Sequence, residues 1–173
     1  MGTGKDPFIK PRNSDFMKST FFLNPYKVIL RNKILHGFEK LNQGEYKALT
    51  NLFSDRVHYR FEGDHALGGE RFTKQAVELW FERLLRLLPL RFEITSMLIQ
   101  GMPWNTDVVI EFRDHVSPKH QEPYVNNGIQ KIKIKWGKAV DVHTYVDTYK
   151  IQTALQKLAE HGVQEATAKP IEG

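Results

Sequence analysis

The stretch from Pro123 to Thr148 constrains the fold most, because it holds two runs in which apolar and polar residues alternate. The runs are Ile129 to Trp136 and Val140 to Asp147, and Gly137-Lys138 joins them. Alternation at every second residue is typical of a strand with one buried face. A short glycine-containing link between two such runs predicts an antiparallel hairpin. One apolar face is not a core, so other segments must cover its residues, which are Ile132, Ile134, Val140, Val142 and Val146.

The remaining sequence predicts helices that can cover this face. Helical spacing of apolar residues, Asn24-Pro25 as an N-terminal cap and Pro89 as a stop define the helices. The expected helices are 24–44, 45–53, 72–88 and 149–161, and the expected further strands are 57–62, 91–100 and 107–116, with 63–71 as a glycine-rich loop. The order of helix, helix, strand, helix and four antiparallel strands predicts an α+β fold with helices on one face of a curved sheet.

The chain is predicted to form one domain with two extensions. With 173 residues and 40% hydrophobic content it can bury a sizeable core. The domain is expected over residues 23–161. Residues 1–22 are interpreted as an arm or tail and residues 162–173 as a C-terminal tail.

Composition argues against several classes of protein. The chain has no cysteine, no apolar run long enough to cross a membrane and no apolar signal region, so we expect a cytoplasmic protein without a membrane span. Its net charge is +5, but the basic residues are interleaved with acidic ones, which argues against a nucleic-acid surface. The nearest histidines, His115 and His120, do not have metal-ligand spacing, and neither a metal nor a cofactor is expected.

Several short motifs resemble those of one superfamily. They are Leu41-Asn42-Gln43-Gly44-Glu45, Leu52-Phe53-Ser54-Asp55, Gly68-Gly69, Trp136-Gly137 and Tyr145-Val146-Asp147-Thr148. In this order and spacing they resemble the nuclear transport factor 2-like superfamily, and more closely its SnoaL-like and ketosteroid-isomerase-related members, from about Pro25 to Leu158. The resemblance implies a cone: a strongly curved antiparallel sheet wrapped around N-terminal helices, with a central pocket open at one end. It also implies a homodimer through the outer sheet face.

The best-known catalytic residues of this group are missing. The resemblance places the tyrosine of ketosteroid isomerase at Gly37, its base at Phe61 and its oxyanion aspartate at Ile132. None of these can act as required, so the standard isomerase reaction is not expected.

Limonene epoxide hydrolase gives a partial match. Tyr59 and Asp114 match its tyrosine and its first aspartate. Phe61 and Phe112 replace its asparagine and arginine, and Thr144 replaces its second aspartate. Without those three groups this mechanism is not expected either.

Asp114 and Tyr59 remain as catalytic candidates. Asp114 shares the inward parity of Val108, Ile110 and Phe112, and burial would raise its pKa and suit it as a base. The alternative is an exposed aspartate at the end of a strand. Tyr59 is a candidate hydrogen-bond donor to a ligand, or else a core tyrosine bonded to the backbone.

Further residues are candidates for the lining of a pocket. Asn126 and Gln130 share the buried parity of the hairpin and require polar partners, either a ligand or an internal network with Thr144. His65 is expected over the pocket mouth, or else exposed on a loop. The expected ligand-binding set is Phe61, His65, Trp80, Phe112, Asn126, Gln130 and Thr144.

The sequence therefore predicts a pocket protein for a hydrophobic, oxygen-bearing small molecule of polyketide, steroid or terpenoid type. If it is an enzyme, it is expected to carry out cofactor-free proton transfer or hydration with Asp114 as the base. The alternative is a non-catalytic ligand-binding or dimeric interaction module.

Overall fold

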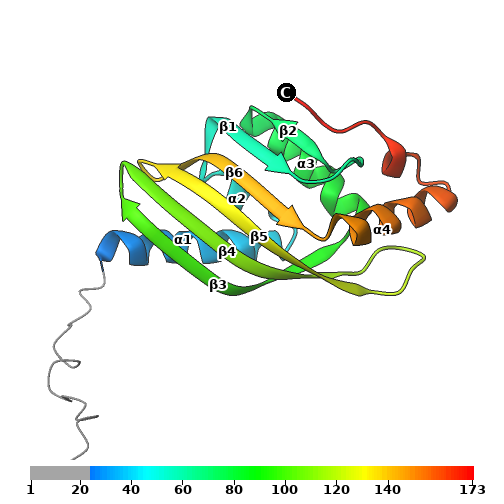
Figure 1. Cartoon of the computed structure of the whole chain (residues 1–173), viewed down its shortest axis with the longest axis horizontal. Helices are drawn as coiled ribbons and strands as arrows, with labels where there is room; N and C mark the ends of the chain where they lie inside the picture. Colours follow the sequence, from blue (N-terminus) through cyan, green and yellow to red (C-terminus); the bar gives the residue numbers. More distant parts are fainter. Residues whose placement is uncertain (1–23) are drawn as a thin grey trace, which may run out of the picture.

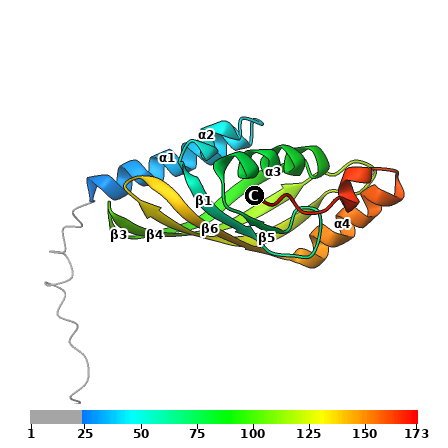
Figure 2. The same ribbon diagram turned by 90° about the horizontal axis from the view of Figure 1, so that it is seen from above.

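The computed structural model describes residues 24–173, in which one curved sheet carries helices on one face (Figure 1, Figure 2). The elements are α1 (Pro25–Leu41), α2 (Lys47–Thr50), β1 (Phe53–Phe61), β2 (Gly69–Arg71), α3 (Lys74–Leu87), β3 (Leu90–Met102), β4 (Asn105–Val116), β5 (Tyr124–Lys135), β6 (Lys138–Val146), α4 (Thr148–Glu160) and a 3-10 helix, Gln164–Thr167. Among the described residues, none of the helices is both long and apolar enough to cross a membrane. The predicted arm, residues 1–22, lies outside the described residues.

The sheet has six strands in the order β2-β1-β6-β5-β4-β3. The four strands β3 to β6 are antiparallel, as predicted. However, β1 runs parallel to β6, so the sheet is mixed rather than wholly antiparallel. The prediction that residues 63–71 form only a loop is also wrong, because Gly69–Arg71 pairs with β1 as the edge strand β2. The α+β cone with helices inside the curve is confirmed.

The central hairpin of β5 and β6 forms with a shifted turn. Trp136 and Gly137, rather than Gly137 and Lys138, make the two-residue link, with φ values of 52° and 77°. Positive φ at both turn positions matches the twist of a tight hairpin. A register shift after Lys133 then pairs Ile134 with Ala139. Ala139 is consequently 3% exposed and occupies the core position that we predicted for Val140.

The helix starts follow the capping residues. The Asn24 side chain accepts a hydrogen bond from the backbone N–H of Tyr26 at 3.1 Å, and Pro25 follows at the first helical position. The Asp147 side chain caps α4 by accepting from the N–H of Lys150. The second helix is shorter than expected, because its apolar end at Phe53 belongs to β1 instead.

Helices α1, α2 and α3 lie along the inner side of the sheet, whereas α4 lies beyond one end (Figure 2). The buried stripe of α3 includes Val77, Trp80 and Leu84, as its helical spacing predicts. Residues 162–173 run back from α4 toward α3 and β2 (Figure 1). Arg83 donates to the carbonyl oxygen of Lys169 at 2.8 Å, so this segment is fixed against α3.

Candidate functional site

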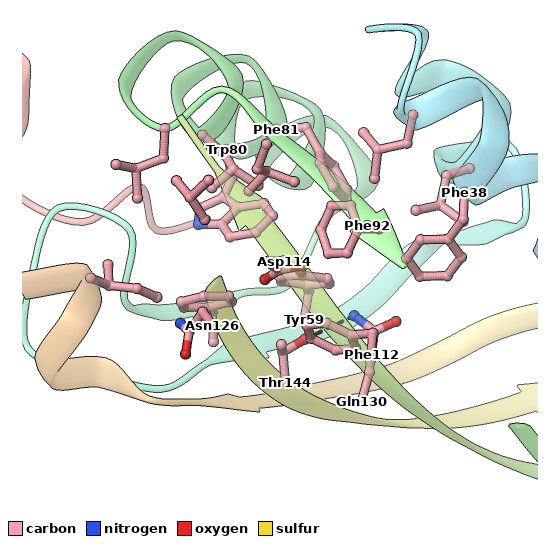
Figure 3. A pocket seen from close by; sticks show the side chains of 18 of the residues that line it. Phe38, Tyr59, Trp80, Phe81, Phe92, Phe112, Asp114, Asn126, Gln130 and Thr144 are labelled. Carbon is pink, nitrogen blue, oxygen red and sulfur yellow. Dashed lines mark hydrogen bonds between the residues drawn. The ribbon is translucent and has the colours of Figure 1, made fainter. Parts of the chain in front are cut away.

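A cavity lies between α1, α3 and the concave face of the sheet (Figure 3). Its wall is mostly aromatic and aliphatic, with a few polar side chains. The space free of protein atoms is about 510 Å³, but only about 30 Å³ of it admits the centre of a water-sized sphere. One water centre needs at least about 10–15 Å³ by this measure. The cavity is therefore a narrow void between rings, and a larger ligand must move side chains aside.

Asp114 is a buried carboxyl group in the cavity wall. Its side chain comes from β4, and the residue is 7% exposed. Its Oδ1 atom is buried and has no hydrogen-bond partner among residues 24–173. Burial raises the pKa of Asp114 well above its ordinary value, because the charged form loses its hydration. The inward orientation predicted for this residue is confirmed, and the strand-end alternative is not.

Tyr124 is a site residue that sequence reasoning missed. It lies on β5 in the cavity wall, on the same face as Asn126, which pairs with Asp114 across the ladder. Its hydroxyl is buried, and no described residue forms a hydrogen bond with it. Burial, with the nearby charges of Asp114 and Asp147, raises its pKa to about 12. The inward parity of Asn126 could have identified it, since residues two apart on a strand share a face.

The two amides expected to need polar partners have them within the protein. Gln130 donates from Nε2 to the Thr144 hydroxyl at 2.8 Å. Asn126 donates to the carbonyl oxygen of Asp147 at 3.3 Å and accepts from the N–H of Asn127 at 3.0 Å. All three predicted residues line the cavity, and the internal network that we considered as one alternative is present.

The ring of Phe112 packs against a glycine on the neighbouring strand β5. It faces Gly128 across the ladder, between the Asp114–Asn126 pair and Gln130. A Cβ atom at Gly128 would lie 2.6 Å from the Cε2 atom of the ring. Because Gly128 has no side chain, the Phe112 ring can pack directly against the sheet at this position.

The aromatic side of the cavity contains Tyr59, Phe61 and Trp80. The ring of Trp80 lies 5.0 Å from that of Tyr59 and 5.2 Å from that of Phe61, centroid to centroid. Its indole N–H donates to the carbonyl oxygen of Leu67 at 2.7 Å. Burial raises the pKa of Tyr59, although a hydrogen bond with Thr144 partly opposes the shift. At neutral pH Tyr59 is therefore a neutral donor.

His65 does not line this cavity, so its expected place over the mouth is wrong. It lies in a separate cleft between the glycine-rich loop, α4 and residues 166–170. Its Nδ1 atom accepts from the N–H of Leu67 at 3.3 Å, and its buried Nε2 atom has no hydrogen-bond partner within the described part of the chain. Burial lowers its pKa, which favours the neutral imidazole.

Arg71 is a fully buried cation behind the aromatic wall. Its guanidinium group donates to the carbonyl oxygens of Leu67, Gly68 and Gly69 and lies 5.5 Å from the centroid of the Trp80 ring. Burial lowers its pKa to about 10. Arg71 thereby fixes the glycine-rich loop against the helix that carries Trp80.

The positions that the resemblance assigned to ketosteroid isomerase chemistry are closed by apolar contacts. At Gly37 a Cβ atom would lie 2.9 Å from Cδ1 of Leu49 and 3.3 Å from its Cα. Leu49 thus takes the space of a tyrosine. Phe61 and Ile132 are buried apolar residues, 7% and 6% exposed. Within residues 24–173, no group of three or more His, Asp or Glu side chains is arranged to hold a metal ion.

Solved structures place the chain in a fold class. An NTF2-like protein of unknown function from Burkholderia pseudomallei matches with a TM-score of 0.64 at 11% identity, covering 72% of this chain and 95% of that one. A protein with a ketosteroid isomerase-like fold from Catenulispora acidiphila, in complex with trimethylamine, matches with a TM-score of 0.54 at 15% identity, covering 67% and 83%. TerC, co-crystallised with polyporic acid, matches with a TM-score of 0.64 at 14% identity, covering 73% and 98%.

These matches define the fold. The chain has the nuclear transport factor 2-like fold, the cone shared with ketosteroid isomerase-like proteins. No family model and no curated protein sequence matches it. Function must therefore be argued from the site, since this fold carries many functions.

Proposed function

We propose that this chain binds a mostly apolar, oxygen-bearing small molecule in the cavity between α3 and the sheet. The observation that supports this is a pair of buried polar groups, the Asp114 carboxyl and the Tyr124 hydroxyl, on neighbouring strands of one apolar wall, for which residues 24–173 supply no hydrogen-bond partner. A buried polar group without a partner costs about 1–3 kcal/mol. A ligand oxygen placed between them offsets that cost, whereas a hydrocarbon does not.

The chemistry we propose is proton transfer without a cofactor. The raised pKa of Asp114 makes it a stronger base than an ordinary carboxylate, and its protonated form is a hydrogen-bond donor. Tyr124 remains neutral at physiological pH and donates from its hydroxyl. In the ionised form of Asp114, a ligand carbonyl held by Tyr124 alone would present a neighbouring C–H to the carboxylate, which would take that proton and return it to another carbon of the resulting enolate. In this scheme Asp114→Asn abolishes turnover of a substrate, and unchanged turnover would exclude Asp114 as the base.

Replacing Tyr124 with phenylalanine should stabilise the free protein. The variant removes a buried, unpaired hydroxyl and keeps the ring, so the free energy of unfolding should rise by about 1 kcal/mol. Tyr59→Phe is the matched control. It removes a hydroxyl that interacts with Thr144 and should lower stability by about 1 kcal/mol. Urea denaturation of both variants measures the difference, and a loss of stability in Tyr124→Phe would show that its hydroxyl has a partner.

The same variant tests ligand recognition. Decalone and decalin share a ring shape, but only decalone carries a carbonyl oxygen. Calorimetric titration should show decalone binding at least about tenfold more tightly, because decalin leaves both polar groups unpaired. Tyr124→Phe should reduce this preference. Equal affinity for the two molecules would contradict the proposal.

The outer face of the sheet supports a second proposal, a homodimeric interaction module. Leu98, Ile129 and Tyr145, here called the outer patch, are 68%, 48% and 46% exposed on β3, β5 and β6. Ile129 and Tyr145 pair directly across the ladder. Large apolar side chains exposed on one face of a sheet favour burial against a partner. We propose that a second copy of the chain covers the outer patch.

Ile129→Lys should convert this dimer to a monomer, because it places a charge at the centre of a buried apolar contact. Leu79→Lys is the control, since Leu79 is 48% exposed on α3, away from the sheet's outer face. Light scattering after gel filtration measures the mass. A wild-type monomer at micromolar concentration would exclude the dimer.

A further inference from the structure

A second, apolar cavity, here called the second chamber, lies beneath α1 next to the cavity that contains Asp114. This second chamber is lined from α1 by Leu30 and Ile34 and from the hairpin by Ile132, Ile134 and Ala139. It admits water centres over about 20 Å³, slightly less than the cavity that contains Asp114. The two voids share three wall residues, Phe38, Leu49 and Gln130. These three side chains form the partition between them.

Phe38 is held in this partition from several sides. Its ring packs edge-on against Phe92, with 5.4 Å between centroids, and Phe92 packs edge-on against Phe112 at 5.5 Å. One helical turn beyond Phe38, the Asn42 side chain donates to the carbonyl oxygen of Phe92 at 2.9 Å and accepts from its N–H at 2.7 Å. These bonds fix β3 against the end of α1. These contacts therefore hold the Phe38 ring at a defined place in the wall between the two voids, next to the rings of Phe92 and Phe112 (Figure 3).

Leu49 completes the partition because α1 and α2 approach closely. The lack of a side chain at Gly37 lets the backbone of Leu49 come within 3.3 Å of the position that a Cβ atom would occupy. Leu49 is 6% exposed and Phe38 is 4% exposed, so both are packed rather than free to swing into solvent.

The position of the partition limits the length of a ligand. Asp114 pairs with Asn126, and Gln130 lies four residues further along the same face of β5. Four residues of a strand span roughly 13 Å. A ligand whose oxygen contacts Asp114 and Tyr124 therefore meets Gln130 and Phe38 after about this length. In the part of the chain that the structure describes, Gln130 is the only polar side chain that lines the second chamber, and its Nε2 atom already donates to Thr144, so this chamber favours an apolar group.

We propose that Phe38 determines ligand length by separating the cavity from the chamber beneath α1, so that the protein selects compact, ring-shaped oxygenated molecules over long-chain ones. This inference rests on the proposed ligand-binding function. It assigns a specificity-determining role to a residue that has no polar group and does not contact the reacting atoms.

A series of methyl ketones with chains from hexyl to dodecyl tests the proposal by calorimetric titration. In the wild type, affinity should rise about fourfold with each methylene that becomes buried, and then stop rising once the chain reaches Gln130. In Phe38→Ala the rise should continue for the longer ketones, because the second chamber is open to them. If the alanine variant does not fold, the same titration is done with Phe38→Leu, which removes the ring but keeps an apolar side chain.

Filling the second chamber provides the matched control. Ala139 is 3% exposed in its wall, and Ala139→Leu adds volume there without touching the Asp114 cavity. In the Phe38→Ala background this substitution should restore the wild-type limit, while affinity for the hexyl ketone stays the same. An identical limit in the wild type and in a folded Phe38 variant would overturn the inference alone. Failure of every ketone to bind the wild type would overturn the proposed function as well.

Discussion

Asp114→Asn should become more stable relative to the wild type as the pH rises. The folded wild-type chain binds a proton at Asp114 more tightly than the unfolded chain, because burial raises the pKa of this carboxyl above its ordinary value near 3.8. Above that ordinary value the folded state holds more protons than the unfolded state, so wild-type stability falls with increasing pH. The fall is about 1.4 kcal/mol per pH unit until the raised pKa is passed. Asparagine does not ionise, and the variant lacks this loss.

Urea denaturation of both chains between pH 4 and pH 8 measures the effect. Asp107→Asn is the matched control on the same strand, since Asp107 points outward and pairs with Lys133 at 2.6 Å. Its replacement should cost less than about 1 kcal/mol, as is usual for exposed ion pairs. If the difference in unfolding free energy between the wild type and Asp114→Asn stays constant with pH, Asp114 is not desolvated.

Trp80→Ala should destabilise the chain by about 3–5 kcal/mol, the usual cost of removing a large buried aromatic residue. Trp80 is 2% exposed and packs against both Tyr59 and Phe61. Its loss also removes the hydrogen bond to the carbonyl oxygen of Leu67 and the ring over which Arg71 lies. The variant should therefore lose the aromatic packing against Tyr59 and Phe61, and its glycine-rich loop should be less ordered.

Leu79→Ala, at the position before Trp80 on α3, is the control for changes in helix propensity. Leu79 is 48% exposed, so its replacement should change stability by less than about 0.5 kcal/mol. Thermal and urea unfolding of both variants provide the comparison. A similar small change in Trp80→Ala would show that the indole does not support the wall of the cavity.

Period-two alternation was sufficient to predict the hairpin and the inward faces of its strands. Asp114, Asn126 and Gln130 all line the cavity because the side-chain period of a strand is two. The same rule wrongly placed Val140 in the core. A register shift after Lys133 puts Ala139 at that core position instead. Such a shift depends on how a strand meets its neighbours, which alternation within one strand does not encode.

Two contacts across the fold could not be predicted from local pattern. Arg71 lies within a glycine-rich stretch that looks like a loop, yet it is buried beneath Trp80 because a three-residue strand forms there. His65 belongs to the same stretch, and the C-terminal segment helps to form its cleft. Both placements depend on partners distant in sequence.

The partners of the inward polar residues also required the three-dimensional arrangement. Parity identifies Gln130 as inward, but only the packing of β6 beside β5 shows that Thr144 satisfies it. The unpaired groups are instead Asp114 and Tyr124, which the sequence separates by a loop. Sequence reasoning therefore found most of the polar side chains of the wall but not which of them are open to a ligand.

The infrared carbonyl stretch of decalone bound to the wild-type protein tests the central claim most directly. If Asp114 and Tyr124 hold a ligand oxygen in an apolar cavity, the stretch should move to lower frequency on binding than in a hydrocarbon solvent, and Tyr124→Phe should reverse part of that shift. A bound ketone whose stretch matches that in hydrocarbon, or the absence of saturable binding, would contradict the account.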